Sequence, residues 1–248
     1  MITLGIDIGG SAIKGALVDL DRGALTTERV RFETEPLYKP RVAAELVEKI
    51  RKKLNYHGVI GAGYPGVVKK GVAFTAANLH KNWIGTDVGQ LLSNQTGQPV
   101  TVLNDADAAG LAEMRFGVED ARMYKTVLFL TVGTGIGSAI FVDGQLMPNT
   151  ELGHLKVRGK DAEYRASDAV RQREELSWKQ WGKRFTEVLR TYENLLSPDL
   201  FIIGGGISSK FENYAEYLKI QTKIVPAKLE NLAGIIGAAM AAQETKLI

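Results

Sequence analysis

Two glycine-rich segments of the same kind constrain the fold of this chain more than any other feature. Residues 5–11 (GIDIGGS) and 131–138 (TVGTGIGS) each join two apolar, strand-like runs. Glycine has no side chain and adopts positive φ without penalty, so the amide groups of such a turn can converge on an anion. One copy predicts no more than a hairpin turn. Two copies, each with a hydroxyl residue, predict two phosphate-binding turns, and Asn104-Asp105 lies between them in the chain.

Neither turn has the form of the two best-known phosphate loops. The sequence contains no Gly-x4-Gly-Lys-Ser/Thr, and no Gly-x-Gly-x-x-Gly that leads from a strand straight into a helix. The second turn is followed instead by an apolar run over residues 136–142 and then by Asp143-Gly144. This order of strand, turn and strand disfavours the common nucleotide-binding folds.

Composition limits the class of protein. A chain of 248 residues that is 45% hydrophobic can bury the core of one large domain or two modest ones. Its longest apolar runs, such as 127–132, are far below the roughly 20 residues of a membrane helix, and the N-terminus has the pattern of a strand, not of a leader peptide. We therefore expect a cytoplasmic protein without membrane association. With no Cys and three scattered His, any metal should be a hard ion held by oxygen.

Charge is balanced overall and uneven locally. The net charge of +3, from 31 basic and 28 acidic residues, does not indicate nucleic-acid binding. Residues 156–190, however, hold ten Lys or Arg against six Asp or Glu. A solvated helix face is the simpler explanation of that excess, and a binding track for a polyanion is the alternative.

The hydrophobic pattern predicts alternating strands and helices. For one helix from Pro40, the residues Val42, Leu46, Ile50 and Leu54 form the expected buried stripe, and for another, Ser177 and Gln180 have the spacing of a capping box. Strands are expected at 2–8, 12–19, 28–34, 58–63, 99–103, 125–132, 136–142 and 200–203, and helices at 40–54, 87–96, from 177 onward and at 234–242.

A set of motifs in a fixed order resembles the superfamily of sugar kinases, Hsp70 and actin, and within it the ROK family (repressors, open reading frames and sugar kinases). Besides the two glycine turns, the motifs are GYPG at 63–66, Asn78-Leu79 followed by Trp83, NDADAA at 104–109, ELGH at 151–154 and GGGI at 204–207. The resemblance implies an α/β, two-lobed, actin-like (ribonuclease H-like) sugar-kinase fold with mixed β-sheets flanked by helices. We expect a small N-terminal lobe over residues 1–104 and a larger C-terminal lobe over 105–248, with the C-terminal helix able to pack back on the first lobe.

The departure from the family pattern is also informative. Most ROK proteins follow the Glu-x-Gly-His motif with a Cys-rich zinc loop, and this chain has no Cys. Residues 159–167 (GKDAEYRAS) and 175–178 (ELSW) instead resemble the polyphosphate glucokinase branch. That resemblance implies a magnesium-dependent enzyme without zinc that transfers a phosphoryl group from inorganic polyphosphate, ATP or both to the 6-hydroxyl of glucose. The family is commonly dimeric, which implies a homodimer.

Roles for individual residues follow from the resemblance and from their chemistry. Asp105 is the expected general base for the sugar hydroxyl, although an Asp at the start of a helix is as often a cap. Asp7 is expected to hold Mg²⁺ through water. Lys14 is a candidate ligand of the phosphate donor, although a solvated lysine on a strand is as common. The expected sugar ligands are Asn78, Asn104, Asp105, Glu151, His154 and Glu163, and the expected ligands of the phosphate donor are Gly9, Gly10, Ser11, Lys14, Thr134, Gly135, Gly205 and Gly206.

The basic excess in residues 156–190 gains a candidate purpose from the same resemblance. A polyphosphate chain carries roughly one negative charge per phosphate, so Lys and Arg along its path would bind it in a salt-sensitive way, as they bind a nucleic-acid backbone. The candidates for such a track are Lys14, Arg165, Arg171, Lys179, Lys183 and Arg184.

Other functions stay open at this point. Within the enzyme class, the alternative is a strictly ATP-dependent ROK hexokinase that acts on glucose, mannose or an N-acetylhexosamine. A sugar-responsive repressor would need a DNA-binding domain before the first glycine turn, whereas the first strand is expected to begin at Ile2. A sugar-binding protein without activity is disfavoured because Asp7, Asp105 and both turns are present.

Overall fold

The computed structural model describes residues 1–76 and 79–243 and divides into two compact units. Unit 1 consists of Met1–Ala112 together with the segment from Leu232 through the last helix, and unit 2 is Glu113–Asn231. The chain thus passes from unit 1 to unit 2 after Ala112. The boundary predicted from the sequence lies between residues 104 and 105. Each unit is described by itself.

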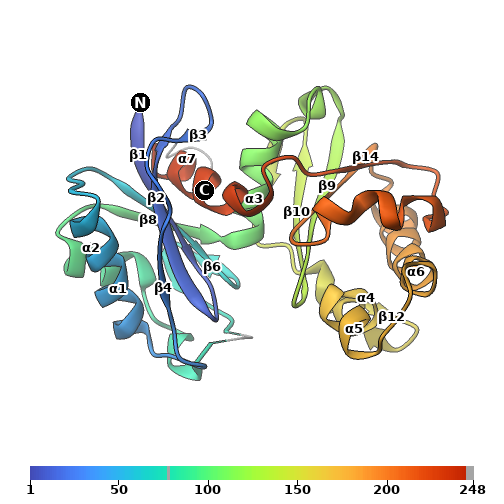
Figure 1. Ribbon diagram of the computed structural model, residues 1–248, viewed down its shortest axis with the longest axis horizontal. Helices are drawn as coiled ribbons and strands as arrows, with labels where there is room; N and C mark the ends of the chain where they lie inside the picture. The colour runs from blue at the N-terminus through green and yellow to red at the C-terminus, as the bar shows by residue number, and fades with distance from the viewer. Residues whose placement is uncertain (77–78, 244–248) are drawn as a thin grey trace. The chain divides into compact units, whose positions relative to one another are not determined.

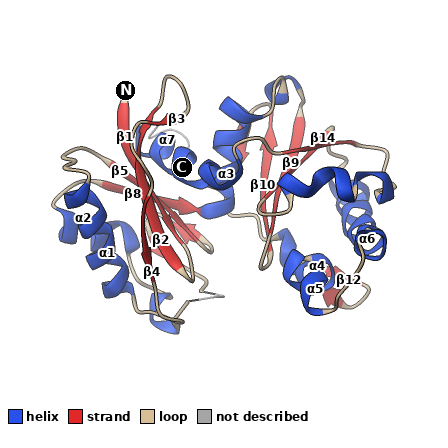
Figure 2. Cartoon of the chain, in the orientation of Figure 1, coloured by secondary structure: helices blue, strands red, loops and turns tan. Residues whose placement is uncertain are grey.

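Unit 1 is built on a six-stranded mixed sheet (Figures 1 and 2). Its strand order is β3-β2-β1-β5-β8, and β4 also pairs with β2. The β1–β2 pair is antiparallel and is joined by the first glycine turn, whereas β1, β5 and β8 run parallel. The bounds are β1 (Ile2–Ile8), β2 (Ala12–Asp19), β3 (Ala24–Leu25), β4 (Val30–Glu33), β5 (Ile60–Tyr64) and β8 (Val100–Asn104), with a separate hairpin of β6 (Val68–Lys69) and β7 (Val72–Ala73).

Helices cover both faces of this sheet, with α1 and α2 on one face and α3 and α7 on the other (Figure 1). The predicted stripe of α1 is wrong at its first residue, because Val42 is exposed while Ala43, Ala44 and Val47 are buried. A spacing of four residues drifts around a helix of 3.6 residues per turn, so a stripe drawn that way leaves the buried face. The bounds are α1 (Pro40–Lys53), η1 (Lys81–Trp83), α2 (Val88–Thr96), α3 (Asp105–Ala112) and α7 (Ala233–Gln243).

Glycines allow α7 to lie directly on the backbone of its neighbours. A Cβ atom added to Gly5 of β1 would lie 2.0 Å from the carbonyl oxygen of Ile235, and one added to Gly61 of β5 would lie 1.6 Å from that of Ala238. The same holds within the helix, where a Cβ on Gly237 would lie 1.7 Å from the oxygen of Ala108 in α3. The predicted small-residue helix is therefore confirmed as α7. It packs directly on β1, β5 and α3.

Unit 2 contains a five-stranded mixed sheet of order β11-β10-β9-β14-β15 (Figure 2). The antiparallel pair β9–β10 is joined by the second glycine turn, and β14 runs parallel to both β9 and β15. Both glycine turns thus connect antiparallel neighbours, as the sequence predicted. The bounds are β9 (Thr126–Val132), β10 (Ile136–Val142), β11 (Gln145–Met147), β14 (Leu200–Gly204) and β15 (Lys223–Pro226), with a hairpin of β12 (Lys156–Val157) and β13 (Lys160–Asp161).

The long helix α6 packs on this sheet and begins as predicted. The Ser177 hydroxyl accepts a hydrogen bond from the Gln180 amide at 3.3 Å, and the Gln180 side chain accepts one from the Ser177 amide at 2.9 Å. Trp181 and Tyr192 are fully buried on its inner face. The helices of unit 2 are α4 (Ala162–Ala166), α5 (Asp168–Arg173) and α6 (Trp178–Leu196), with a π-helix η2 (Glu113–Gly117) and short 3-10 turns η3 (Ala121–Met123), η4 (Leu152–His154), η5 (Ser208–Asn213), η6 (Ala215–Tyr217) and η7 (Glu230–Leu232). No helix within the described ranges is long and apolar enough to cross a membrane.

Candidate active site

The first glycine turn is held through its carbonyl groups. The Gly9 oxygen accepts a hydrogen bond from the Tyr38 hydroxyl at 2.9 Å. The Gly10 and Ser11 oxygens accept bonds from the side-chain hydroxyl and the amide of Thr34, at 3.2 and 3.1 Å. In a planar trans peptide the N–H points opposite to the C=O. The amide groups of Gly10 and Ser11 therefore point away from the residues that hold the turn, as donors to an anion would.

Close contacts, and not positive φ, explain some of the glycines of these turns, whereas a Cβ on Gly133 would meet nothing within 4 Å. Gly9, Gly133 and Gly135 all lie outside the φ range from +20° to +160°, so the conformational reason expected from the sequence is wrong for them. A Cβ on Gly135 would instead lie 2.4 Å from a carboxylate oxygen of Glu163. Gly205, which follows β14 and is also a predicted ligand of the donor, does have a positive φ, at 78°.

Asp7 and Lys14 face one another across the β1–β2 pair. They are register partners, and the Lys14 ammonium lies 3.2 Å from Oδ2 of Asp7, with each side chain about a quarter exposed. Gly234 at the start of α7 lies close, since a Cβ there would be 3.9 Å from the Asp7 carboxyl carbon. Mg²⁺ is commonly held by one or two carboxylates together with phosphate oxygens and water. A single partly exposed carboxylate beside a phosphate-type turn fits that donor set.

Asn104 and Asp105 lie where β8 passes into α3. Oδ1 of Asn104 accepts hydrogen bonds from the amides of Ala106 at 2.8 Å and Asp107 at 3.0 Å, and its Nδ2 donates to the Gly66 oxygen at 3.1 Å. Asn104 thus caps α3, the role that the sequence left open for Asp105. Oδ1 of Asp105 accepts a hydrogen bond from the Ala106 amide at 2.8 Å, within its own turn of the chain.

The second glycine turn is closed on itself and tied to two helices. The Gly133 amide donates to the Gly135 oxygen at 3.0 Å, and the Gly133 oxygen accepts a bond from Ala169 of α5 at 3.1 Å. The Ile136 amide makes a long bond of 3.4 Å to Oε2 of Glu163 in α4. By the same peptide geometry, the Thr134 amide points away from α5.

Glu151, His154 and Glu163 come together in unit 2. His154 Nε2 lies 3.7 Å from Glu151, and its Nδ1 lies 3.8 Å from Glu163 and 3.3 Å from Asp161. Asp161 was not among the predicted site residues. It orients the imidazole of His154, which was predicted. Burial raises the pKa of the Glu151 carboxyl, and the nearby Glu163 charge raises it further, against a lowering effect of His154.

The backbone around this group is fixed to the sheet. A Cβ on Gly153 would lie 2.1 Å from the Ile136 oxygen, so η4 lies against the start of β10. The Leu152 amide donates to the Ser138 hydroxyl at 3.0 Å, and the Leu152 oxygen accepts a bond from the buried Tyr192 hydroxyl at 2.7 Å. These contacts set the positions of Glu151 and His154 at either end of η4.

The remaining predicted residues lie in different surroundings. Gly205 lies against the backbone of Val132, whereas a Cβ on Gly206 would meet nothing within 4 Å. Asn78 lies outside the described residues. Within the part of the chain that the structure describes, no group of three or more His, Cys, Asp or Glu is arranged to hold a metal ion.

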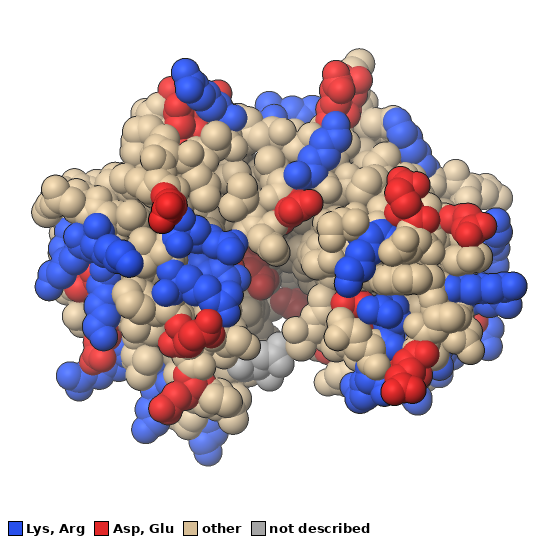
Figure 3. All heavy atoms as spheres, in the orientation of Figure 1, with Lys and Arg blue, Asp and Glu red and all other residues tan. Residues whose placement is uncertain are grey.

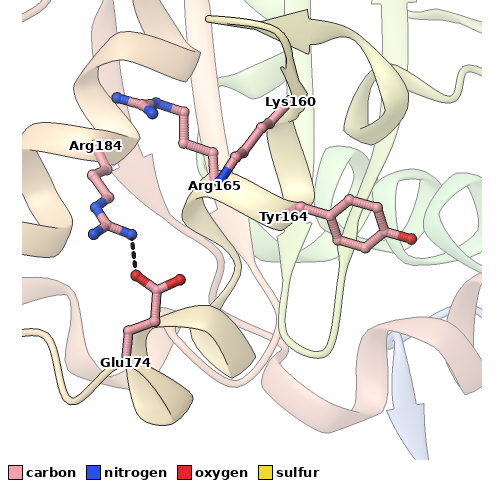
Figure 4. Close-up of a pocket in the computed structure, with 5 residues that line it drawn as sticks. All are labelled: Lys160, Tyr164, Arg165, Glu174 and Arg184. Carbon is pink, nitrogen blue, oxygen red and sulfur yellow. Dashed lines mark hydrogen bonds and ion pairs between the residues drawn. The ribbon is translucent and has the colours of Figure 1, made fainter.

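The basic candidates separate into distinct environments. Over the face shown in Figure 3, Lys and Arg side chains are interspersed with Asp and Glu. Arg171 bonds Asp168 at 2.7 Å and lies 4.1 Å from the centre of the Trp178 ring, which is a structural role. Arg165 and Arg184 line one pocket of unit 2, together with three residues that were not predicted, Lys160, Tyr164 and Glu174 (Figure 4).

Comparison with known proteins now decides the family. The family model described as "ROK family" matches residues 3–164, and a polyphosphate glucokinase of Mycobacterium tuberculosis (strain CDC 1551 / Oshkosh) is 48% identical over 96% of this chain and 89% of its own length. The chain belongs to the ROK family. Among solved structures, the inorganic polyphosphate/ATP-glucomannokinase of Arthrobacter sp. strain KM matches this ROK chain with a TM-score of 0.93 and 45% identity, over 98% of this chain and 99% of its own.

A more distant structure supports the fold alone. A ROK family glucokinase of Streptomyces griseus, in complex with glucose and AMPPNP, has a TM-score of 0.84 at 21% identity, over 98% of this chain and 100% of its own. The predicted α/β sugar-kinase fold is therefore confirmed for this ROK protein.

Proposed function

We propose that this ROK protein phosphorylates glucose at the 6-hydroxyl, with inorganic polyphosphate, ATP or both as the phosphoryl donor and with Mg²⁺. The observation that carries the proposal is the 48% identity to a polyphosphate glucokinase over 96% of the chain. The 45% identity to a polyphosphate/ATP-glucomannokinase supports the same donors. We further propose that the protein acts in the cytoplasm as a homodimer.

Asp105 is the proposed general base. A carboxylate within hydrogen-bond reach of the sugar 6-hydroxyl can take its proton while the oxygen attacks phosphorus. Because Asn104 caps α3, the Asp105 carboxylate is not needed to satisfy both first amides of that helix. Asn104 in turn fixes the backbone that carries Asp105, through its bond to the Gly66 oxygen.

The two glycine turns are the proposed ligands of the donor. Phosphoryl transfer depends mainly on positioning and on neutralising charge. The amides of Gly10, Ser11 and Thr134 would donate to phosphate oxygens, and Lys14 would add a positive charge beside Asp7. Mg²⁺, held by Asp7, would supply further charge neutralisation to the donor phosphates.

Glu151, His154 and Glu163 are the proposed ligands of sugar hydroxyls. Their carboxylates accept hydrogen bonds, and His154, oriented by Asp161, can donate or accept. Burial makes the ionised form of Glu151 costly, as its raised pKa shows, so hydroxyl donors of a sugar would stabilise it. Asn78 remains a proposed ligand on resemblance alone.

A coupled assay for hexose 6-phosphate tests the proposal. Glucose and mannose are each combined with ATP and with long-chain polyphosphate, in the presence of Mg²⁺. We expect turnover of glucose with polyphosphate. Turnover with ATP alone would leave a strictly ATP-dependent hexokinase, and the absence of turnover with every pair would refute the kinase proposal.

A further inference from the structure

Unit 2 contains a polar pocket of about 320 Å³ with a positive lining. Its walls come from four neighbouring segments: Lys160 is the first residue of β13, Tyr164 and Arg165 lie on α4, Glu174 follows α5, and Arg184 lies on α6 (Figure 4). Three cations therefore face one carboxylate. The Arg184 and Glu174 side chains point toward one another, whereas the Tyr164 ring points away from that pair (Figure 4).

Two of the cations are held in place by carboxylates. Arg184 donates to Glu174 at 2.6 Å, and Arg165 donates through Nε to Glu187 at 2.7 Å. A guanidinium has five N–H donors in a fixed fork, so each arginine keeps further donors for a ligand after these bonds. Their orientation is set before a ligand binds, which lowers the entropy lost on binding.

Lys160 differs from the two arginines. Its side chain forms no ion pair or hydrogen bond with any residue that the structure describes, and Lys160 is exposed. The pKa of Glu174 lies below its ordinary range, mainly because Arg184 donates a hydrogen bond to it, and Arg173 and Lys160 contribute through their charge. Glu174 therefore stays ionised at neutral pH and offsets part of the positive charge of the pocket.

The pocket and the second glycine turn share the short helix α4. Glu163 of this helix lies against Gly135 and accepts the long bond from Ile136, while the next two residues, Tyr164 and Arg165, line the pocket. The helix α5, which precedes Glu174, bonds the Gly133 oxygen through Ala169. Pocket and turn are thus neighbours within one unit.

We propose that this pocket binds a segment of the inorganic polyphosphate chain that lies beyond the phosphates held at the glycine turn. The inference rests on the proposed function, because it assumes polyphosphate as a donor. Arginine forks pair with phosphate oxygens in a bidentate way, and lysine adds a compact charge. A chain with a negative charge on every phosphate suits several cations from separate elements, whereas a nucleotide has only its own short phosphate chain.

Two charge-removing variants and one control test the pocket. Lys160→Ala and Arg184→Ala should each raise the KM for long-chain polyphosphate roughly tenfold, the loss expected for a hydrogen bond between charged groups. Lys125→Ala removes an exposed lysine of unit 2 that does not line the pocket, and it should leave this KM unchanged. Glu174→Gln removes the opposing charge, so it should lower the same KM.

A direct binding measurement tests the pocket independently of the proposed function, because it needs no turnover. Calorimetric titration with long-chain sodium polyphosphate, without glucose, should show weaker binding to Lys160→Ala and a logarithmic salt dependence whose slope is smaller by somewhat less than one, by analogy with nucleic acids. Polyphosphate binding without turnover would refute the donor and leave the pocket supported. Equal affinity of wild type and variants, no binding at all, or a parallel rise in the KM for ATP would overturn the pocket proposal.

Discussion

At the scale of single residues, Asp105→Asn separates catalysis from binding. Asparagine has the shape of aspartate and retains an oxygen to accept the bond from the Ala106 amide, so the start of α3 should be preserved. It cannot take a proton from the sugar hydroxyl, and we expect kcat to fall at least about 100-fold with little change in the KM for glucose. Steady-state kinetics with each donor measures both.

The control for this substitution is Asp120→Asn, which makes the same chemical change at an exposed residue of unit 2. It should leave kcat and KM at wild-type values. A near-normal kcat for Asp105→Asn would remove Asp105 as the base.

The site residues that the sequence predicts belong to local motifs. Asn104-Asp105 and Glu151 with His154 stand in short, recognisable segments. Thr34 and Tyr38, which hold the first glycine turn, lie far from it in sequence and reach it through the folded sheet. No local pattern marks such partners, and for the same reason Lys160 was missed as a neighbour of Arg184.

At the scale of elements, the packing of α7 predicts a large effect of a single methyl group. Gly61→Ala and Gly237→Ala would each place a Cβ within 2 Å of a backbone carbonyl oxygen, at 1.6 and 1.7 Å, and backbone cannot move aside as a flexible side chain can. Each should lower the free energy of unfolding by at least about 1–3 kcal/mol, the usual cost of overpacking. Urea unfolding followed by circular dichroism measures this change.

Gly133→Ala is the matched control for α7 packing, because a Cβ there would meet nothing within 4 Å and its φ is not positive. Its free energy of unfolding should stay within about 0.5 kcal/mol of wild type, as for other substitutions away from packed sites. If all three variants were equally stable, the close approach of α7 to β5 and α3 would be refuted.

Long elements were predictable, and short ones were not. Apolar runs and the capping box at Ser177 located the central strands and α6 because those signals lie within the element itself. The hairpins β6–β7 and β12–β13 have two residues per strand, and the short helices α4 and α5 depend on contacts with distant segments. The pocket proposed to bind polyphosphate is built largely from these short elements, so the sequence singled out two of its cations, Arg165 and Arg184, and not the pocket.

At the scale of the whole molecule, Glu113 connects distant parts of unit 2. It is the first residue of that unit, it is fully buried, and its carboxylate accepts hydrogen bonds from the amides of Lys228 at 3.0 Å and Leu229 at 2.7 Å. Burial raises the pKa of Glu113 above its ordinary value of 4.5, and these two bonds oppose the rise. The folded state therefore binds the proton more tightly than the unfolded state.

A raised pKa has a definite sign in the stability of the protein. The contribution of Glu113 is fully present below its unfolded pKa and is lost as the pH rises through the folded pKa. A folded pKa that lies one pH unit above the unfolded pKa corresponds to about 1.4 kcal/mol. Glu113→Gln cannot titrate, so the difference in unfolding free energy between wild type and variant should shrink or reverse as the pH rises from about 4 to about 8. Urea unfolding across this range checks it, and a difference that is independent of pH would contradict it.

Glucose binding should stabilise the whole molecule in a way that identifies the sugar ligands. A ligand that binds only the folded state adds about 2.7 kcal/mol at a concentration 100 times its Kd, which raises Tm. Wild type and Asp105→Asn should show the same glucose-dependent rise in Tm, because Asp105 is the proposed general base and its substitution is expected to spare binding. Glu151→Ala should lose most of the rise. Sorbitol at equal concentration controls for general stabilisation by polyols. A full rise in Glu151→Ala would show that Glu151 does not bind the sugar.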